Sequence, residues 1–138
     1  MNCALFPGQG SQHVGMGKYL YDNFKGAQEL FEEASDTLKL DFKKLCFQGP
    51  EDELQLTENT QPSLLLVSVT CFRIFKELKD IEFQYMAGHS VGEYAACVAA
   101  ESLEFKEALV AVRKRGEFMQ SAVPVGKGAM VAVMGLTP

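Results

Sequence analysis

Short apolar runs alternate along this chain with longer stretches whose apolar residues recur at helical spacing. The short runs predict strands at residues 3–6, 81–86 and 129–134. The longer stretches predict helices over residues 17–40, 60–78, 91–100 and 105–122. Because strands alternate with helices, the pattern predicts an α/β fold with a mainly parallel sheet.

The predicted helix over residues 60–78 has the clearest start signal. Thr60 lies near the expected N-cap and Pro62 in the expected first turn, where the missing N–H of proline costs nothing. Residues 60–78 are apolar around much of the helix circumference, so we expect this helix in the core. Residues 48–50 (Gln-Gly-Pro) interrupt the chain before it.

Between the second predicted strand and the following helix lies a G-x-S-x-G motif centred on Ser90. Strand, Gly-Ser-Gly turn and helix is the context of a nucleophile elbow. Gly88 and Gly92 permit a turn too tight for Cβ atoms, which leaves the serine oxygen exposed at the tip. The motif therefore predicts a serine that attacks a carbonyl carbon.

A glycine-rich loop, residues 8–12, follows the first predicted strand. It lacks the Gly-Lys-Ser/Thr of a phosphate loop and the third glycine of a dinucleotide site. Elbow enzymes take one oxyanion-hole N–H from the residue after the nucleophile and another from a loop after a different strand. Val91 and Gln9 are the candidates, although an ordinary glycine-rich turn explains the loop equally well.

Arg115 is the one charge within the apolar stripe of the last predicted helix. With Ala108 as origin and about 100° per residue, Val112, Arg115, Met119 and Ala122 fall within about 40° of one direction. Arg113, Lys114, Glu117 and Gln120 fall on the opposite, solvated face. An inward guanidinium needs an anionic partner. From the residues alone, an ion pair with Glu93 or Glu58 is favoured over a ligand carboxylate.

Neither histidine is a convincing general base for Ser90. His89 directly precedes the serine, and neighbouring side chains at such a turn generally point apart, so we expect it to brace the turn. His13 lies in the loop after the first strand.

Charge and cysteine spacing exclude several classes of protein. A net charge of −5 argues against non-specific nucleic-acid binding. The chain has neither a basic, apolar leader nor an apolar run long enough to cross a bilayer, so we expect a cytoplasmic protein without membrane contact. The four cysteines lack metal-ligand spacing, so no metal site is expected. Cys71 and Cys97 are expected to be buried thiols.

Four motifs together resemble one family. They are residues 6–12, Gln61-Pro62, residues 88–94, and Arg115-Gly116 with residues 118–120. In order and spacing they are similar to the malonyl-CoA:acyl carrier protein transacylases, acyltransferases of fatty acid and polyketide synthesis. The resemblance implies that Ser90 is the nucleophile and that Gln9 and Val91 form the oxyanion hole. It also implies that Arg115 pairs with the malonate carboxylate, that Gln61 lines the pocket and that His89 lies beside the serine.

The implied reaction moves a malonyl group from coenzyme A to Ser90, and then to the phosphopantetheine thiol of acyl carrier protein. Malonyl-CoA and acyl carrier protein are thus the expected partners, and no cofactor is expected on this chain. A serine hydrolase such as a thioesterase, or a non-catalytic fragment, are the alternatives.

Family members are longer, and their base histidine lies beyond the residues matched here. We therefore expect residues 1–127 to be the N-terminal part of a large hydrolase-like subdomain. Residues 128–138 would be the first strand of a small ferredoxin-like subdomain. Such a portion is expected to be nearly inactive alone and to self-associate through uncovered apolar surface.

Overall fold

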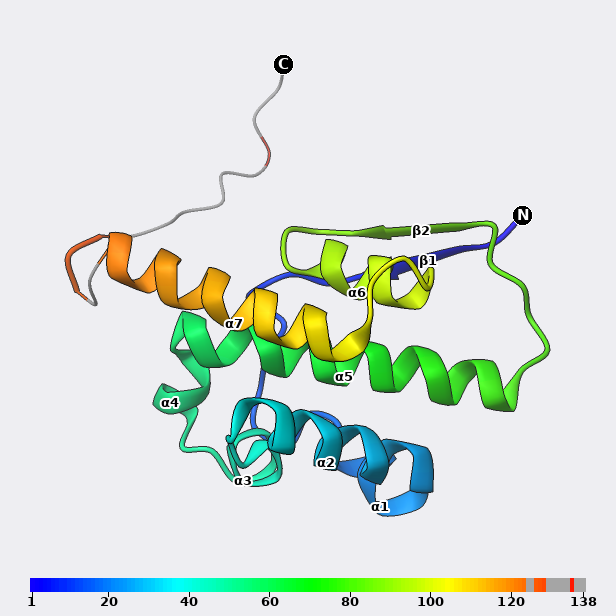
Figure 1. The fold of residues 1–138 in the computed structure, drawn as a ribbon, viewed down its shortest axis with the longest axis horizontal. Helices are drawn as coiled ribbons and strands as arrows, with labels where there is room; N and C mark the ends of the chain where they lie inside the picture. The colour runs from blue at the N-terminus through cyan, green and yellow to red at the C-terminus, as the bar shows by residue number, and fades with distance from the viewer. Residues whose placement is uncertain (124–125, 129–134, 136–138) are drawn as a thin grey trace.

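The computed structural model describes residues 1–123, 126–128 and 135, arranged as a small parallel sheet with a larger set of helices (Figure 1). The elements in chain order are β1 (Cys3–Phe6), α1 (Lys18–Asn23), α2 (Lys25–Leu38), α3 (Phe42–Phe47), α4 (Glu51–Gln55), α5 (Thr57–Leu78), β2 (Tyr85–Gly88), α6 (Gly92–Ala99) and α7 (Phe105–Ala122). The prediction of an α/β fold with a parallel sheet is confirmed.

The two strands pair in parallel, with Cys3 opposite Tyr85 and Phe6 opposite Gly88. The prediction of a strand over residues 81–86 was wrong at both ends. The strand β2 pairs with β1, which begins only at Cys3, so residues 81–84 have no strand to pair with. At the other end, the pairing continues past residue 86 to Gly88. The strand expected at residues 129–134 lies outside the described residues.

The two longest helices form the centre of the helical layer. Figure 1 shows α7 lying along α5, with α2 on the other side of α5 and α6 between these helices and the strands. Completely or nearly completely buried side chains fill the space between them, among them Phe31, Leu65, Leu66, Leu109 and Val112. The core is therefore built by helices, and the sheet lies at its margin.

Several helix boundaries differ from those expected. The helix expected over residues 17–40 divides at Phe24, whose backbone is extended (φ −131°, ψ 124°). Residues 42–55, not expected to be helical, form α3 and α4. Asp41 caps α3 by accepting a hydrogen bond from the Lys44 N–H at 2.9 Å. Helices of five or six residues are too short for a periodic pattern to separate them from other short segments.

Helix α5 begins at Thr57, three residues earlier than expected, so that Pro62 is its sixth residue rather than part of its first turn. A proline there has no N–H to donate to the carbonyl four residues back, which belongs to Glu58. The Arg113 guanidinium of α7 donates to this carbonyl instead, with an Nη1–O distance of 3.1 Å. A side chain from another helix thus satisfies the group that the proline leaves open.

The cysteine prediction was wrong in detail. Cys46 is fully buried in α3, whereas Cys71 and Cys97 are exposed. Both exposed thiols belong to apolar helices, but to faces of α5 and α6 that no described element covers.

One face of the sheet packs inward and the other does not. Phe6 and its neighbours on the inner face contact α6, whereas the outer face carries Cys3, Leu5, Tyr85 and Ala87. Leu5 is 76% exposed and Tyr85 59% exposed.

No described helix combines the length and apolar character needed to span a membrane.

Candidate functional site

Ser90 occupies the tip of the connection between β2 and α6. Its backbone is left-handed, with φ 54°, a conformation that few residues other than glycine adopt. The Gly92 N–H donates to the His89 carbonyl at 2.9 Å, and the Glu93 N–H donates to the Ser90 carbonyl at 3.1 Å. The turn therefore closes at once into α6, and the serine side chain is left exposed at its tip.

The two glycines of the motif are required by close backbone contacts. A Cβ on Gly88 would lie 2.0 Å from the Gly92 carbonyl carbon, and a Cβ on Gly92 would lie 2.4 Å from the Phe6 carbonyl oxygen. Real Cβ atoms do not approach other atoms this closely. The G-x-S-x-G spacing thus brings β2, α6 and the end of β1 together beneath Ser90.

Arg115 of α7 reaches Ser90 from the other side. Its Nη2 donates to Ser90 Oγ at 3.1 Å, and its Nη1 donates to Gln61 Oε1 at 2.6 Å. Gln61 is completely buried in α5, and its Nε2 lies 3.2 Å from Met119 Sδ. The structure therefore brings together three residues that the sequence singled out, Ser90, Arg115 and Gln61.

Neither acid considered as a partner of Arg115 pairs with it. Glu58 pairs with Arg113 instead, at 3.5 Å, and no ion pair of Glu93 is found among the described residues. The placing of Arg113 on a solvated face was therefore wrong: its side chain is only 26% exposed. Met119 and Ala122, expected inside, are exposed, although Met119 Sδ still contacts Gln61 of α5.

The surroundings of Arg115 leave its charge uncompensated. Both of its hydrogen-bond partners are neutral, and no carboxylate of the described residues lies within ion-pair distance of it. A half-buried guanidinium that uses only part of its five N–H donors binds a carboxylate favourably, because the two groups match as a fork. The site is thus suited to an acyl group that carries a negative charge.

The loop after β1 lies against the Ser90 turn. A Cβ on Gly8 would come within 2.5 Å of His89 Nδ1, and the Gln9 side chain donates to Thr57 Oγ1 at 3.2 Å. The backbone N–H groups of Gln9 and Val91 donate no hydrogen bond to any group in the described part of the chain. Two free donors thus belong to the segments that flank the serine.

The two histidines of the chain make no hydrogen bond to Ser90. The His89 N–H donates to the Phe6 carbonyl at 3.0 Å, which extends the pairing of the strands by one residue. His13 Nδ1 lies 3.4 Å from the Ser11 carbonyl oxygen. Within the described residues, Ser90 Oγ therefore has a hydrogen bond from a guanidinium and none with an imidazole.

Sequence reasoning missed the contributions of Arg113, Thr57 and Met119. Pro62 was the available signal for Arg113, because a proline inside a helix leaves one carbonyl open for an outside donor. Nothing in the sequence signalled the contact between Gln9 and Thr57, which depends on how the loop after β1 meets the start of α5.

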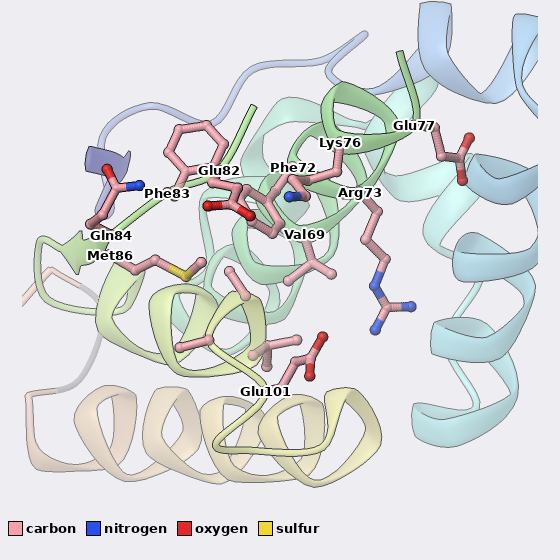
Figure 2. A pocket seen from close by; sticks show the side chains of 13 residues that line it. Val69, Phe72, Arg73, Lys76, Glu77, Glu82, Phe83, Gln84, Met86 and Glu101 are labelled. Atoms are coloured by element: carbon pink, nitrogen blue, oxygen red, sulfur yellow. The ribbon is translucent and has the colours of Figure 1, made fainter. Parts of the chain in front are cut away.

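A hollow of about 770 Å³ among the described residues lies away from Ser90. Figure 2 shows Val69, Phe72 and Met86 at this hollow, with charged side chains from α5 and from residues 82 and 101 around them. It is lined by the beginning of β2 and the end of α6, whereas Ser90 lies where β2 ends and α6 begins. This hollow is therefore separate from the serine turn.

Comparisons with known proteins agree with this arrangement. The family model of the acyl transferase domain matches residues 4–137. The malonyl CoA-acyl carrier protein transacylase of Bacillus subtilis strain 168 is 53% identical over 132 residues, covering 96% of this chain and 41% of the relative. A solved transacylase of the same name from Coxiella burnetii has a TM-score of 0.86 at 48% identity, covering 90% of this chain and 39% of that one.

A further solved structure is a malonyl-transacylase in complex with a type II polyketide synthase acyl-carrier protein. It has a TM-score of 0.84 at 46% identity and covers 90% of this chain and 40% of that one. The chain thus spans about two fifths of the length of these relatives. The match extends over the Gly8–Gln12 loop, the serine turn and Arg115 alike, and the chain belongs to the acyl transferase domain family.

Proposed function

We propose that this chain forms the nucleophile and carboxylate-binding part of an enzyme that transfers malonyl groups from coenzyme A to acyl carrier protein. The observation that carries the proposal is the placement of Arg115, which donates to Ser90 Oγ and to Gln61 and has no carboxylate partner among the described residues. Relatives named malonyl CoA-acyl carrier protein transacylase support the choice of substrates.

In the first half of the reaction, Ser90 Oγ attacks the thioester carbonyl carbon and gives its proton to a general base. The carbon–sulfur bond breaks, and coenzyme A leaves as a thiol after taking up that proton. In the second half, the phosphopantetheine thiol attacks the malonyl ester, the carbon–oxygen bond breaks, and Ser90 recovers its proton. The negative oxygen formed in each half is held by the N–H groups of Gln9 and Val91.

No described residue supplies the base, so the base belongs to the part of the family fold that these residues do not cover. We propose residues 1–127 as the N-terminal part of a large hydrolase-like subdomain, with Ser90 on its nucleophile elbow. Residues 128–138 would begin a small ferredoxin-like subdomain. The chain itself holds no cofactor in this scheme, since phosphopantetheine is carried by acyl carrier protein.

Arg115 gives the proposed enzyme its preference for malonyl over acetyl groups. The malonyl carboxylate pairs with the guanidinium, which Gln61 holds from the buried side. An acetyl group leaves the guanidinium without an anion, and loss of a hydrogen-bonded charge partner costs about 2–5 kcal/mol. His89 contributes by packing on Gly8, which holds the loop of Gln9 near the serine.

The test joins residues 1–138 to the remaining C-terminal part of the Bacillus subtilis relative. We expect the joined chain to transfer malonyl groups to acyl carrier protein, and Ser90→Ala to abolish transfer. Arg115→Ala should lower the preference for malonyl-CoA over acetyl-CoA by at least about tenfold. Lys114→Ala, an exposed neighbour on the same helix, is the control and should leave the preference unchanged.

Two results would contradict the proposal. Release of free malonate in place of malonyl-acyl carrier protein would identify a hydrolase. Equal use of malonyl-CoA and acetyl-CoA by the unmodified joined chain would remove the role of Arg115. Residues 1–138 alone should turn over far more slowly than the joined chain, because no described group takes the serine proton.

A further inference from the structure

Arg113 makes more polar contacts than any other side chain near the site. Its Nη1 donates to the Glu58 carbonyl at 3.1 Å and to Asn59 Oδ1 at 2.6 Å. Its Nε donates to Glu117 Oε1 at 2.8 Å, and its Nη2 lies 3.5 Å from Glu58 Oε1. One guanidinium thus joins α7 to two consecutive residues of α5.

These contacts meet α5 at its weak point. Pro62 cannot donate to the Glu58 carbonyl, so this turn of α5 lacks one of its own hydrogen bonds. Arg113 supplies the missing donor, and Asn59 and Glu58 hold the guanidinium in place. The turn carrying Gln61, the residue before the proline, is therefore completed by a residue of α7.

The same two helices also carry the pair Arg115 and Gln61. Their backbones come into close contact at Gly116, which lies between the directions of Arg113 and Arg115 around α7. A Cβ on Gly116 would lie 2.6 Å from Glu58 Cα and 2.8 Å from the Thr57 carbonyl oxygen. At about 100° per residue, Arg113 lies about 60° from Gly116 on one side of α7, and Arg115 lies about 100° from it on the other. The contacts of Arg113 therefore resist rotation of α7 about its own axis. Such a rotation would move the Arg115 guanidinium away from Gln61.

We propose that Arg113 is a positioning residue, which fixes the rotation and register of α7 on α5 so that the Arg115 guanidinium stays between Gln61 and Ser90. Arg113 does not touch Ser90 itself in the described contacts. Its effect on acyl-group selection passes through Arg115, and in this respect the inference rests on the proposed malonyl transfer.

The test measures dissociation constants of malonyl-CoA and acetyl-CoA for the 138-residue chain by calorimetry, together with the unfolding temperature. Arg113→Met keeps the aliphatic stem and removes the four polar contacts. We expect it to lower the preference for malonyl-CoA about tenfold, as expected when a charge-assisted hydrogen bond is misaligned. Arg113→Lys, which keeps the charge near Glu58, should recover part of the preference.

Lys114→Met is the matched control on the same helix and should leave both measurements unchanged. If Arg113→Met does not fold, Asn59→Ala removes a single partner of the guanidinium and should lower the preference by a smaller factor. A lower unfolding temperature with an unchanged preference would make Arg113 merely structural and overturn the inference. An unmodified chain that binds the two ligands equally would overturn the proposed function as well.

Discussion

The four cysteine side chains have very different surroundings. Cys46 is fully buried in α3, whereas Cys3, Cys71 and Cys97 are exposed. Burial raises the pKa of the Cys46 thiol to about 11, and the nearby Ser63 hydroxyl offsets a smaller part of that rise. Cys46 therefore remains a protonated core residue at neutral pH.

The titration of Cys46 predicts a loss of stability in alkaline solution. The unfolded chain loses this proton near the ordinary pKa of 9.0, whereas the folded chain keeps it to about 11. The contribution of Cys46 is thus fully present below about pH 9 and is lost toward about pH 11, by about 2–3 kcal/mol in all. Urea unfolding at several pH values should show a steeper loss for the unmodified chain than for Cys46→Ala. Equal slopes would contradict the prediction.

Single positions of the site differ in how far the sequence could predict them. The inward placement of Arg115 follows from helical periodicity, because Ala108 and Val112 on the same stripe are buried. Its partner could not be predicted, since Glu58 and Gln61 both belong to the first turns of α5. Which of them meets Arg115 depends on Arg113, whose contact with the carbonyl opened by Pro62 also takes up Glu58.

At the scale of elements, the contact of α6 with β1 depends on the absence of a side chain at position 92. A methyl group there would meet the Phe6 and Pro7 carbonyl oxygens at 2.4 and 2.7 Å, and backbone atoms cannot turn aside as a flexible side chain can. We expect Gly92→Ala to lower the free energy of unfolding by about 1–3 kcal/mol or more, since overpacking forces the helix away from the strand. Chemical denaturation would measure this loss.

Gly26→Ala in α2 provides a control for this substitution. The added methyl group would meet only the end of the Glu77 side chain at 3.2 Å and Ile74 at 3.6 Å. Gly26 is the second residue of α2, where the gain from alanine is smaller than the about 0.5–1 kcal/mol of a helix interior, so this variant should be unchanged or slightly more stable. The explanation of the motif fails if the two variants are equally stable.

Elements with a long apolar stripe could be predicted from the sequence, and those fixed by contacts could not. Helix α7 spans Phe105–Ala122, as its periodicity indicates, and β1 spans Cys3–Phe6. The ends of β2 follow from its pairing with β1, and the Glu58 carbonyl in the first turn of α5 finds its donor on α7. Neither kind of information is present in a local pattern.

At the scale of the molecule, the outer face of the sheet is unusual for a parallel arrangement. Parallel sheets are normally covered on both faces, and two strands alone make a weak sheet. Here Leu5 and Tyr85 expose most of their surface on the outer face, while α6 covers the inner one. No described element covers this apolar face, so we expect it to favour contact between copies of the chain.

Charged substitutions on this face should reduce self-association of the 138-residue chain. Leu5→Lys and Tyr85→Lys each place a charge where a second copy would have to desolvate it, so the dissociation constant should rise about tenfold. Tyr19→Lys on α1 is the control, because Tyr19 is 72% exposed and lies outside the sheet. Sedimentation over a concentration series would measure the change. Equal association of all three variants would show that this face is not the contact.

The left-handed backbone of Ser90 determines which type of residue is most stable at this position. A residue other than glycine is disfavoured in that conformation by roughly 1–2 kcal/mol, so glycine would make the turn more stable than serine does. A glycine at position 90 in a related chain would therefore suit the turn better but would lack the hydroxyl that the proposed function needs.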